Sequence, residues 1–115
     1  MSTRATQDTP QKYAVIDFAG SGNNELVAAV TGKKIRILAA FMISAGTVIA
    51  RFESAADGTA LSGQMTLAVN TGFCLPYNPV GWGETIISQA LNLELGGAVS
   101  VDGMLVYQLV DPNNK

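Results

Sequence analysis

Short apolar runs alternate with turn-forming residues along almost the whole sequence, and this rhythm constrains the fold more than any other feature. Turn signals such as Thr31-Gly32 and Asn70-Thr71-Gly72 recur roughly every 8–12 residues, a spacing typical of β-sandwiches and barrels. The runs expected to form strands are 13–18, 25–30, 34–43, 47–53, 64–69, 73–75, 84–89, 91–95 and 99–110. The sequence therefore predicts an all-β chain, a single antiparallel β-sandwich of about eight strands.

The length of 115 residues suits one domain. Residues 1–11 contain no large apolar side chain after Met1, so a flexible N-terminal arm is expected before a sandwich domain at 12–110 and a polar tail at 111–115. Frequent glycine and β-branched residues leave a helix as an alternative only at 25–30 and 85–90. No signal-peptide pattern and no run of roughly 18–20 apolar residues is present, which predicts folding in a cytoplasm and no membrane contact.

Two expected strands are apolar on both faces. In 34–43 the predicted core face carries Ile35, Ile37, Ala39, Phe41 and Ile43, and the opposite face begins with Lys34 and Arg36 and continues with Leu38, Ala40 and Met42. In 99–110 the core set Val99, Val101, Leu105, Tyr107 and Leu109 is opposed by Met104, Val106 and Val110. A strand that is apolar on both faces needs a cover on both. The cover is either a neighbouring subunit or a second layer of the same chain.

Charged residues make up only 14% of the chain, where about 25% is typical. Interfaces are depleted in charge, so a homo-oligomer or a docked partner explains this composition, and a surface rich in Ala, Gly, Thr and Asn is the alternative. The net charge of −2 argues against binding to a nucleic-acid backbone, which requires a concentrated basic face.

The sequence provides no catalytic, cofactor-binding or metal-binding set. It contains no histidine, which removes the commonest general base and metal ligand. The nine carboxylates are dispersed, and Asp57-Gly58 and Asp102-Gly103 are interpreted as turn or bulge positions. The single Cys74 lies among apolar neighbours and is expected to be a buried structural thiol. No enzymatic activity is therefore predicted.

One segment, 70–84, concentrates aromatic residues: Phe73, Tyr77 and the sole Trp82, with Pro76 and Pro79 stiffening the chain. This aromatic loop has three interpretations. It can cap its own domain, anchor a protein–protein contact through rings of the kind found at interface hot spots, or stack sugars as in a lectin.

The stretches 65–68, 76–82, 90–93 and 97–103, with Tyr107 and the earlier segment 32–36, resemble a group of small virion structural proteins of tailed bacteriophages. The resemblance covers roughly residues 30–110 and implies a β-sandwich of jelly-roll type. Capsid decoration (cement) proteins of this size form trimers that reinforce the shell, and similar β-modules also occur on tails and fibres. The resemblance brings no catalytic residues.

The leading hypothesis is therefore a capsid decoration protein that works as a homo-oligomer, expected to be a trimer, bound to the major capsid protein or another virion protein after folding in the host cytoplasm. A tail or fibre module is the first alternative, and a carbohydrate-binding domain that uses Trp82 and Tyr77 is the second. The candidate contact residues are Phe73, Tyr77, Trp82, Leu38, Met42, Met104, Val106, Arg4 and Thr9.

Overall fold

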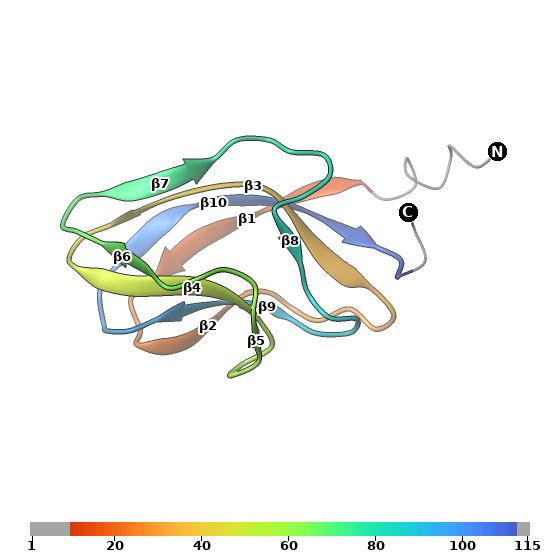
Figure 1. The fold of residues 1–115 in the computed structure, drawn as a ribbon, viewed down its shortest axis with the longest axis horizontal. Coiled ribbons are helices and arrows are strands. Elements are labelled where there is room, and N and C mark those ends of the chain that lie inside the picture. Colours follow the sequence, from red (N-terminus) through yellow and green to blue (C-terminus); the bar gives the residue numbers. More distant parts are fainter. Residues whose placement is uncertain (1–9, 113–115) are drawn as a thin grey trace.

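A computed structural model describes residues 10–112, and all regular structure in that range is β. Its ten strands are β1 (Gln11–Phe18), β2 (Gly22–Val27), β3 (Lys34–Ser44), β4 (Val48–Ser54), β5 (Thr59–Ala60), β6 (Met65–Leu67), β7 (Gly72–Leu75), β8 (Gly83–Glu84), β9 (Leu91–Leu95) and β10 (Val101–Val110). They form two antiparallel sheets that face each other (Figure 1). The prediction of an all-β, antiparallel sandwich is confirmed.

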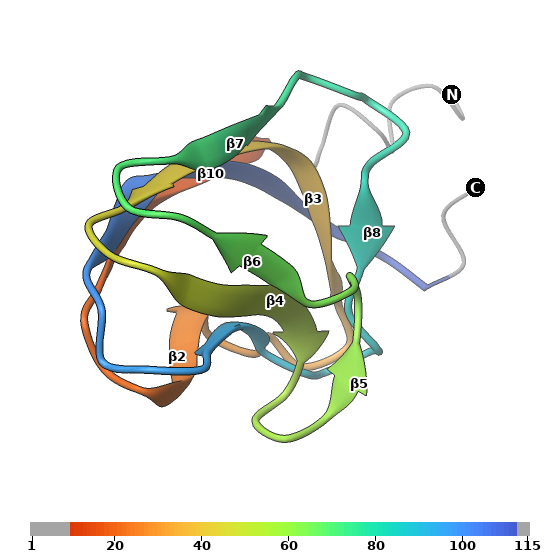
Figure 2. The same ribbon diagram turned by 60° about the vertical axis from the view of Figure 1, so that its left-hand side comes forward.

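The two sheets divide the strands so that chain neighbours often lie in opposite layers. Sheet A has the order β1-β10-β3-β7, with β8 also pairing with β3. Sheet B has the order β2-β9-β4-β5, with β6 also pairing with β4. In the turned view, β6 lies beside β4 in one layer and β7 belongs to the other (Figure 2). Each sheet therefore combines strands from the two ends of the chain with strands from its middle.

The core lies between the sheets and follows the period-2 alternation of the strands. Leu91, Leu93 and Leu95 of β9 are buried, as the alternation of 91–95 predicts, and they pack in one cluster with Ile16 of β1 and Phe52 of β4. The largest apolar side chains of both sheets thus share one continuous core.

The predicted core face of β3 is wrong in its second half. Ile35 and Ile37 are buried as expected, but beyond them the buried positions are Ala40 and Met42, and Phe41 is exposed. The cause is a β-bulge: Tyr107 of β10 pairs with Ile37 and Val106 pairs with Ala39, so Leu38 is an extra residue on β3. One extra residue shifts the alternation of everything that follows it.

Several boundaries also differ from the predictions. β2 begins upstream of the expected run at 25–30, and neither helical alternative forms. Of the expected strand at 84–89 only Glu84 lies in a strand, as the second residue of β8. Beyond it, the Thr85 amide donates to the Ile35 carbonyl at the start of β3, and the Ser88 amide donates to the Lys33 carbonyl just before β3. Asp57-Gly58 lies in a turn, as predicted. Gly103 instead lies inside β10 opposite Met42, so its interpretation as a turn or bulge residue is wrong.

Candidate functional site

The outer face of sheet A is covered with exposed apolar side chains. One row runs in register across four strands, through Val15, Met104, Phe41 and Cys74. We call the "apolar face" the outward-pointing set of sheet A, which comprises Tyr13, Val15, Ala39, Phe41, Ile43, Cys74, Met104 and Val106. Exposed fractions are 68% for Tyr13, 63% for Val15, 49% for Phe41 and 56% for Ile43. Isolated exposed apolar residues are common, but a contiguous set marks an interaction surface.

Cys74 belongs to this face and is exposed, so the prediction of a buried thiol is wrong. Its neighbours Phe73 and Leu75 are half-buried and pack against the core. Because side chains alternate along a strand, this packing turns Cys74 outward.

A shallow hollow of ≈ 260 Å³ lies on the apolar face. It is lined by residues of β3, β7 and β10 and by Pro76 and Tyr77 of the aromatic loop. None of its lining residues is charged. The aromatic loop therefore extends the apolar face beyond the end of β7.

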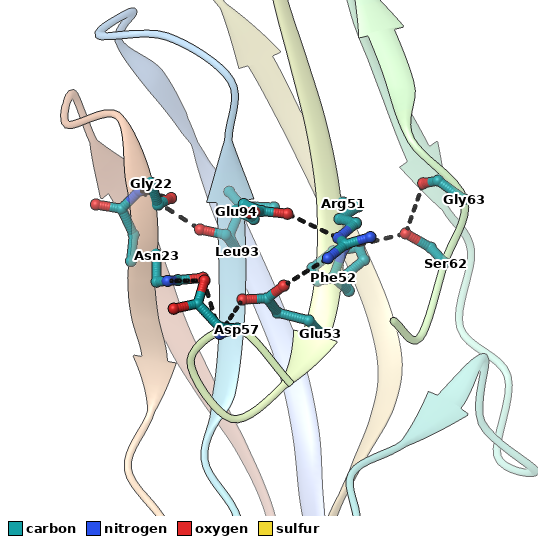
Figure 3. Close-up of polar contacts among 11 residues, drawn as sticks. Gly22, Asn23, Arg51, Phe52, Glu53, Asp57, Ser62, Gly63, Leu93 and Glu94 are labelled. Carbon is teal, nitrogen blue, oxygen red and sulfur yellow. Dashed lines mark hydrogen bonds and ion pairs between the residues drawn. The ribbon is translucent and has the colours of Figure 1, made fainter. Parts of the chain in front are cut away.

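The outer face of sheet B is polar (Figure 3). Arg51 Nη2 lies 3.2 Å from Glu53 Oε2, and Arg51 Nε lies 2.7 Å from Glu94 Oε1. Glu53 is fully buried and its other oxygen accepts a hydrogen bond from the Asp57 amide at 3.2 Å, while Asn23 Nδ2 donates to Asp57 Oδ1 at 3.0 Å. The charged side chains on this face pair with one another within the chain, and Glu53 has no exposed surface. The two faces of the sandwich thus differ sharply in chemistry.

Two carboxylates meet at one end of the apolar face. Asp17 of β1 pairs directly with Asp102 of β10, and Asp102 pairs with Ile43 of β3. The hydrogen bond with Asp17 raises the pKa of Asp102 above its usual value, and desolvation and the like charge of Asp17 raise it further. No signal in the sequence predicts this pair, because 85 positions separate its members and only the β1–β10 register joins them.

This carboxylate pair predicts a pH-dependent stability. A raised pKa means that the folded state binds the proton more tightly than the unfolded state, so repulsion in the pair lowers stability above that pKa and disappears as the pH falls through it. We expect Asp102→Asn to raise the urea midpoint at pH 7 and to leave it unchanged at a pH below the usual aspartate range. Adding Asp17→Asn to Asp102→Asn should give little further gain at pH 7. A lower midpoint for Asp102→Asn at pH 7 would contradict this account.

The aromatic loop is bound to its own domain. The amides of Asn78 and Trp82 donate to the carbonyls of Leu38 and Ile37 at 2.8 and 2.7 Å. The Trp82 indole donates to the Pro76 carbonyl at 2.8 Å, and Gln11 Nε2 donates to the Tyr77 hydroxyl at 2.6 Å. These contacts favour the interpretation as a structural cap, with the Tyr77 ring left on the border of the apolar face.

The structure separates the predicted contact residues that it describes into three groups. Met104 and Val106 lie on the apolar face, and Tyr77 borders it; Phe73 and Trp82 line a second hollow of ≈ 170 Å³ together with Ile37 and Phe52. Leu38 and Met42 are buried, so their side chains are not available to a partner. The bulge turns Met42 into the core, whereas Leu38 is the extra residue of the bulge itself. Arg4 and Thr9 lie outside the described residues.

Sequence reasoning missed Tyr13, Val15, Phe41 and Ile43 as surface residues. The signal for β1 was present, because Tyr13 and Val15 alternate with the equally apolar Ala14 and Ile16, making 13–18 a third two-sided strand. For Phe41 and Ile43 no local signal exists, since the bulge that exposes them forms only on pairing with β10.

Comparison of the chain with protein-family models, curated proteins and solved structures finds no match. Between residues 10 and 112 there is no helix long and apolar enough to cross a membrane. The same range holds no group of three or more His, Cys, Asp or Glu residues placed to bind a metal ion. The most distinctive feature of the described chain is the contrast between its apolar and polar faces.

Proposed function

We propose that the protein is a structural subunit, not an enzyme, and that it works by burying the apolar face against neighbouring protein in a larger assembly. The observation that carries this proposal is the row Val15-Met104-Phe41-Cys74, which exposes apolar side chains in register on four paired strands. An antiparallel sheet whose outer face is solvated normally carries polar residues there, as sheet B does. The low charge of 14% agrees with a chain that hides part of its surface.

The specific form that we propose is a capsid decoration protein of a tailed bacteriophage, bound as a homo-oligomer to the major capsid protein. The sequence resemblance supports this form. The strand order supports a jelly-roll sandwich as well: without the two-residue strands β5 and β8, the sheets read β1-β10-β3-β7 and β2-β9-β4-β6, with first and last strands adjacent in each layer. A tail or fibre module would use the same face, and the two differ only in virion location.

The carbohydrate-binding alternative gains nothing from the geometry. A sugar site needs aromatic faces with free polar groups beside them. The indole N–H of Trp82 and the hydroxyl of Tyr77 already bond within the chain. We therefore do not propose it.

The first test is the solution mass of the protein by light scattering over a range of concentrations. We expect the wild type to exceed the 12.0 kDa of one chain, and Phe41→Asp to lose any association that is made through the apolar face. Phe41 lies in the middle of the face, and a buried, unpaired carboxylate at this site should weaken association by at least about 100-fold. Ile49→Asp is the matched control, because Ile49 is 42% exposed on the outer face of sheet B.

Binding to capsids tests the virion form separately. The wild type and Ile49→Asp should pellet with purified tailed-phage capsids that lack their decoration protein, and Phe41→Asp should remain in the supernatant. A wild-type protein that is monomeric at every concentration and does not pellet would overturn the proposal. Equal pelleting of Phe41→Asp and the wild type with capsids would show that the apolar face is not the interface.

A further inference from the structure

We propose that the free edge of β1 pairs with β1 of a second copy, antiparallel, about a two-fold axis that passes beside Val15. This inference deepens the proposed function and rests on its self-association. It names the second copy as the occupant of one particular edge and fixes the register in which the two copies meet.

β1 is an edge strand that lacks the usual protection. It pairs with β10 on one side, and no other described strand pairs with it. Natural edge strands avoid pairing between chains by carrying charges, prolines or bulges. β1 has charges only near its ends, at Lys12 and Asp17, and the four residues between them, 13–16, are uncharged and regular in register with β10. A backbone edge of this kind is competent to accept another strand.

The sequence of β1 complements itself in one register. In an antiparallel pair about a two-fold axis, facing residues lie on the same side of the sheet, so the two members of each pair are separated by an even number of positions. With Val15 opposite Val15 of the second copy, Tyr13 lies opposite Asp17 of that copy, and this contact occurs twice. All three residues point to the outer side of sheet A.

The Tyr13–Asp17 contact joins two features that the single chain leaves unexplained. Tyr13 is 68% exposed, and its hydroxyl makes no hydrogen bond within the described part of the chain. Asp17 and Asp102 are two facing carboxylates with no cation bonded to them in the same range. Facing residues in a sheet lie about 5 Å apart, and the longer tyrosine side chain then reaches the carboxylate pair. The phenol hydrogen supplies the donor that the two carboxylates lack when both are ionised.

Pairing in this way would also extend the apolar face. A two-fold axis perpendicular to the sheet turns the outer faces of both copies toward the same side. The rows through Val15 and Met104 would then continue from one copy into the next. The pair would present one continuous apolar surface, larger than either copy offers alone, to the partner that the proposed function requires.

Disulfide trapping tests the edge contact. In a Cys74→Ser background, Val15→Cys should form a covalent dimer under mild oxidation, because facing residues in an antiparallel pair have Cα atoms roughly 4.5–5.5 Å apart, within disulfide range. An equimolar mixture of Tyr13→Cys and Asp17→Cys should cross-link more than either variant alone. Ile49→Cys in the same background is the control and should remain monomeric on denaturing gels. Absence of the Val15→Cys dimer at concentrations where the protein self-associates would overturn the pairing.

Removal of a single hydroxyl tests the register. Tyr13→Phe keeps the ring and loses only the donor, and it does so in both contacts of the dimer, so the dimer should weaken at least about 100-fold in light scattering, the loss expected for two hydrogen bonds to a charged group. An unchanged dimer would overturn the Tyr13–Asp17 contact. If the wild type is strictly trimeric and Phe41→Asp dissociates the trimer, the β1 pair is overturned and the proposed function stands. If the wild type is a monomer that binds nothing, both are overturned.

Discussion

Gly103→Ala is expected to destabilise the domain severely. A Cβ atom at position 103 would lie 1.9 Å from the Phe41 carbonyl oxygen and 2.7 Å from the Met42 Cα, and both atoms belong to the backbone of β3. No change of rotamer relieves a clash between a Cβ atom and a backbone, so β10 and β3 would have to separate. We expect a loss of roughly 3–5 kcal/mol or more, against a total stability of about 5–15 kcal/mol for a domain. Circular dichroism and the urea midpoint would measure it.

Gly63→Ala provides the matched control. The same methyl group at position 63 meets no atom within 4 Å, and its backbone does not have a positive φ. The substitution also reduces the entropy of the unfolded chain, so its stability should equal or slightly exceed that of the wild type. If the urea midpoint of Gly103→Ala equals that of the wild type, β3 and β10 do not approach each other as closely as they do in the structure.

Gly72 occupies the corresponding place on the other side of β3. A Cβ atom there would lie 1.6 Å from the Met42 carbonyl oxygen. The C-terminal part of β3 therefore runs between two glycines, one from β7 and one from β10. This close approach could not be predicted from the sequence, where Gly72 and Gly103 resemble any other turn residue. Only the strand order shows that both meet the same short stretch of β3.

The fold class could be predicted because its signals are local. Turn residues set the spacing of the strands, and Leu91, Leu93 and Leu95 alternate with polar neighbours in a strand whose inner face is the core. The prediction of a strand at 84–89 was wrong because its apolar residues, Ile86 and Ile87, are exposed. They lie in a turn that runs beside the start of β3 and makes only isolated main-chain hydrogen bonds there. Composition alone could not distinguish that turn from a strand.

The candidate site was only partly predictable, for a reason that lies in β3. Low charge and two-sided strands correctly indicated an apolar surface, and Met104 and Val106 were placed on it. The two faces of β3 were assigned on the assumption of unbroken alternation. That assumption placed Phe41 and Ile43 in the core and named Leu38 and Met42 as contact residues. The bulge is a property of the β3–β10 pair, so it cannot be predicted from the sequence of either strand alone.

Opposite results for Leu38→Asp and Phe41→Asp are therefore expected, and they test the bulge directly. Leu38 has no exposed surface, so Leu38→Asp loses about 2–5 kcal/mol of buried leucine and also buries an unpaired carboxylate. That variant should be unfolded by circular dichroism at neutral pH. Phe41 is half-exposed, so Phe41→Asp should remain folded with a midpoint near that of the wild type.

The pair of variants also decides how any loss of assembly is interpreted. Unbroken alternation along β3 predicts the reverse outcome, a folded Leu38→Asp and an unfolded Phe41→Asp. That result would contradict both the bulge and the apolar face. If Phe41→Asp is folded but no longer associates, the loss belongs to the surface, because its core is intact. The position of one extra residue in β3 thus determines which side chains the protein can offer to a neighbour.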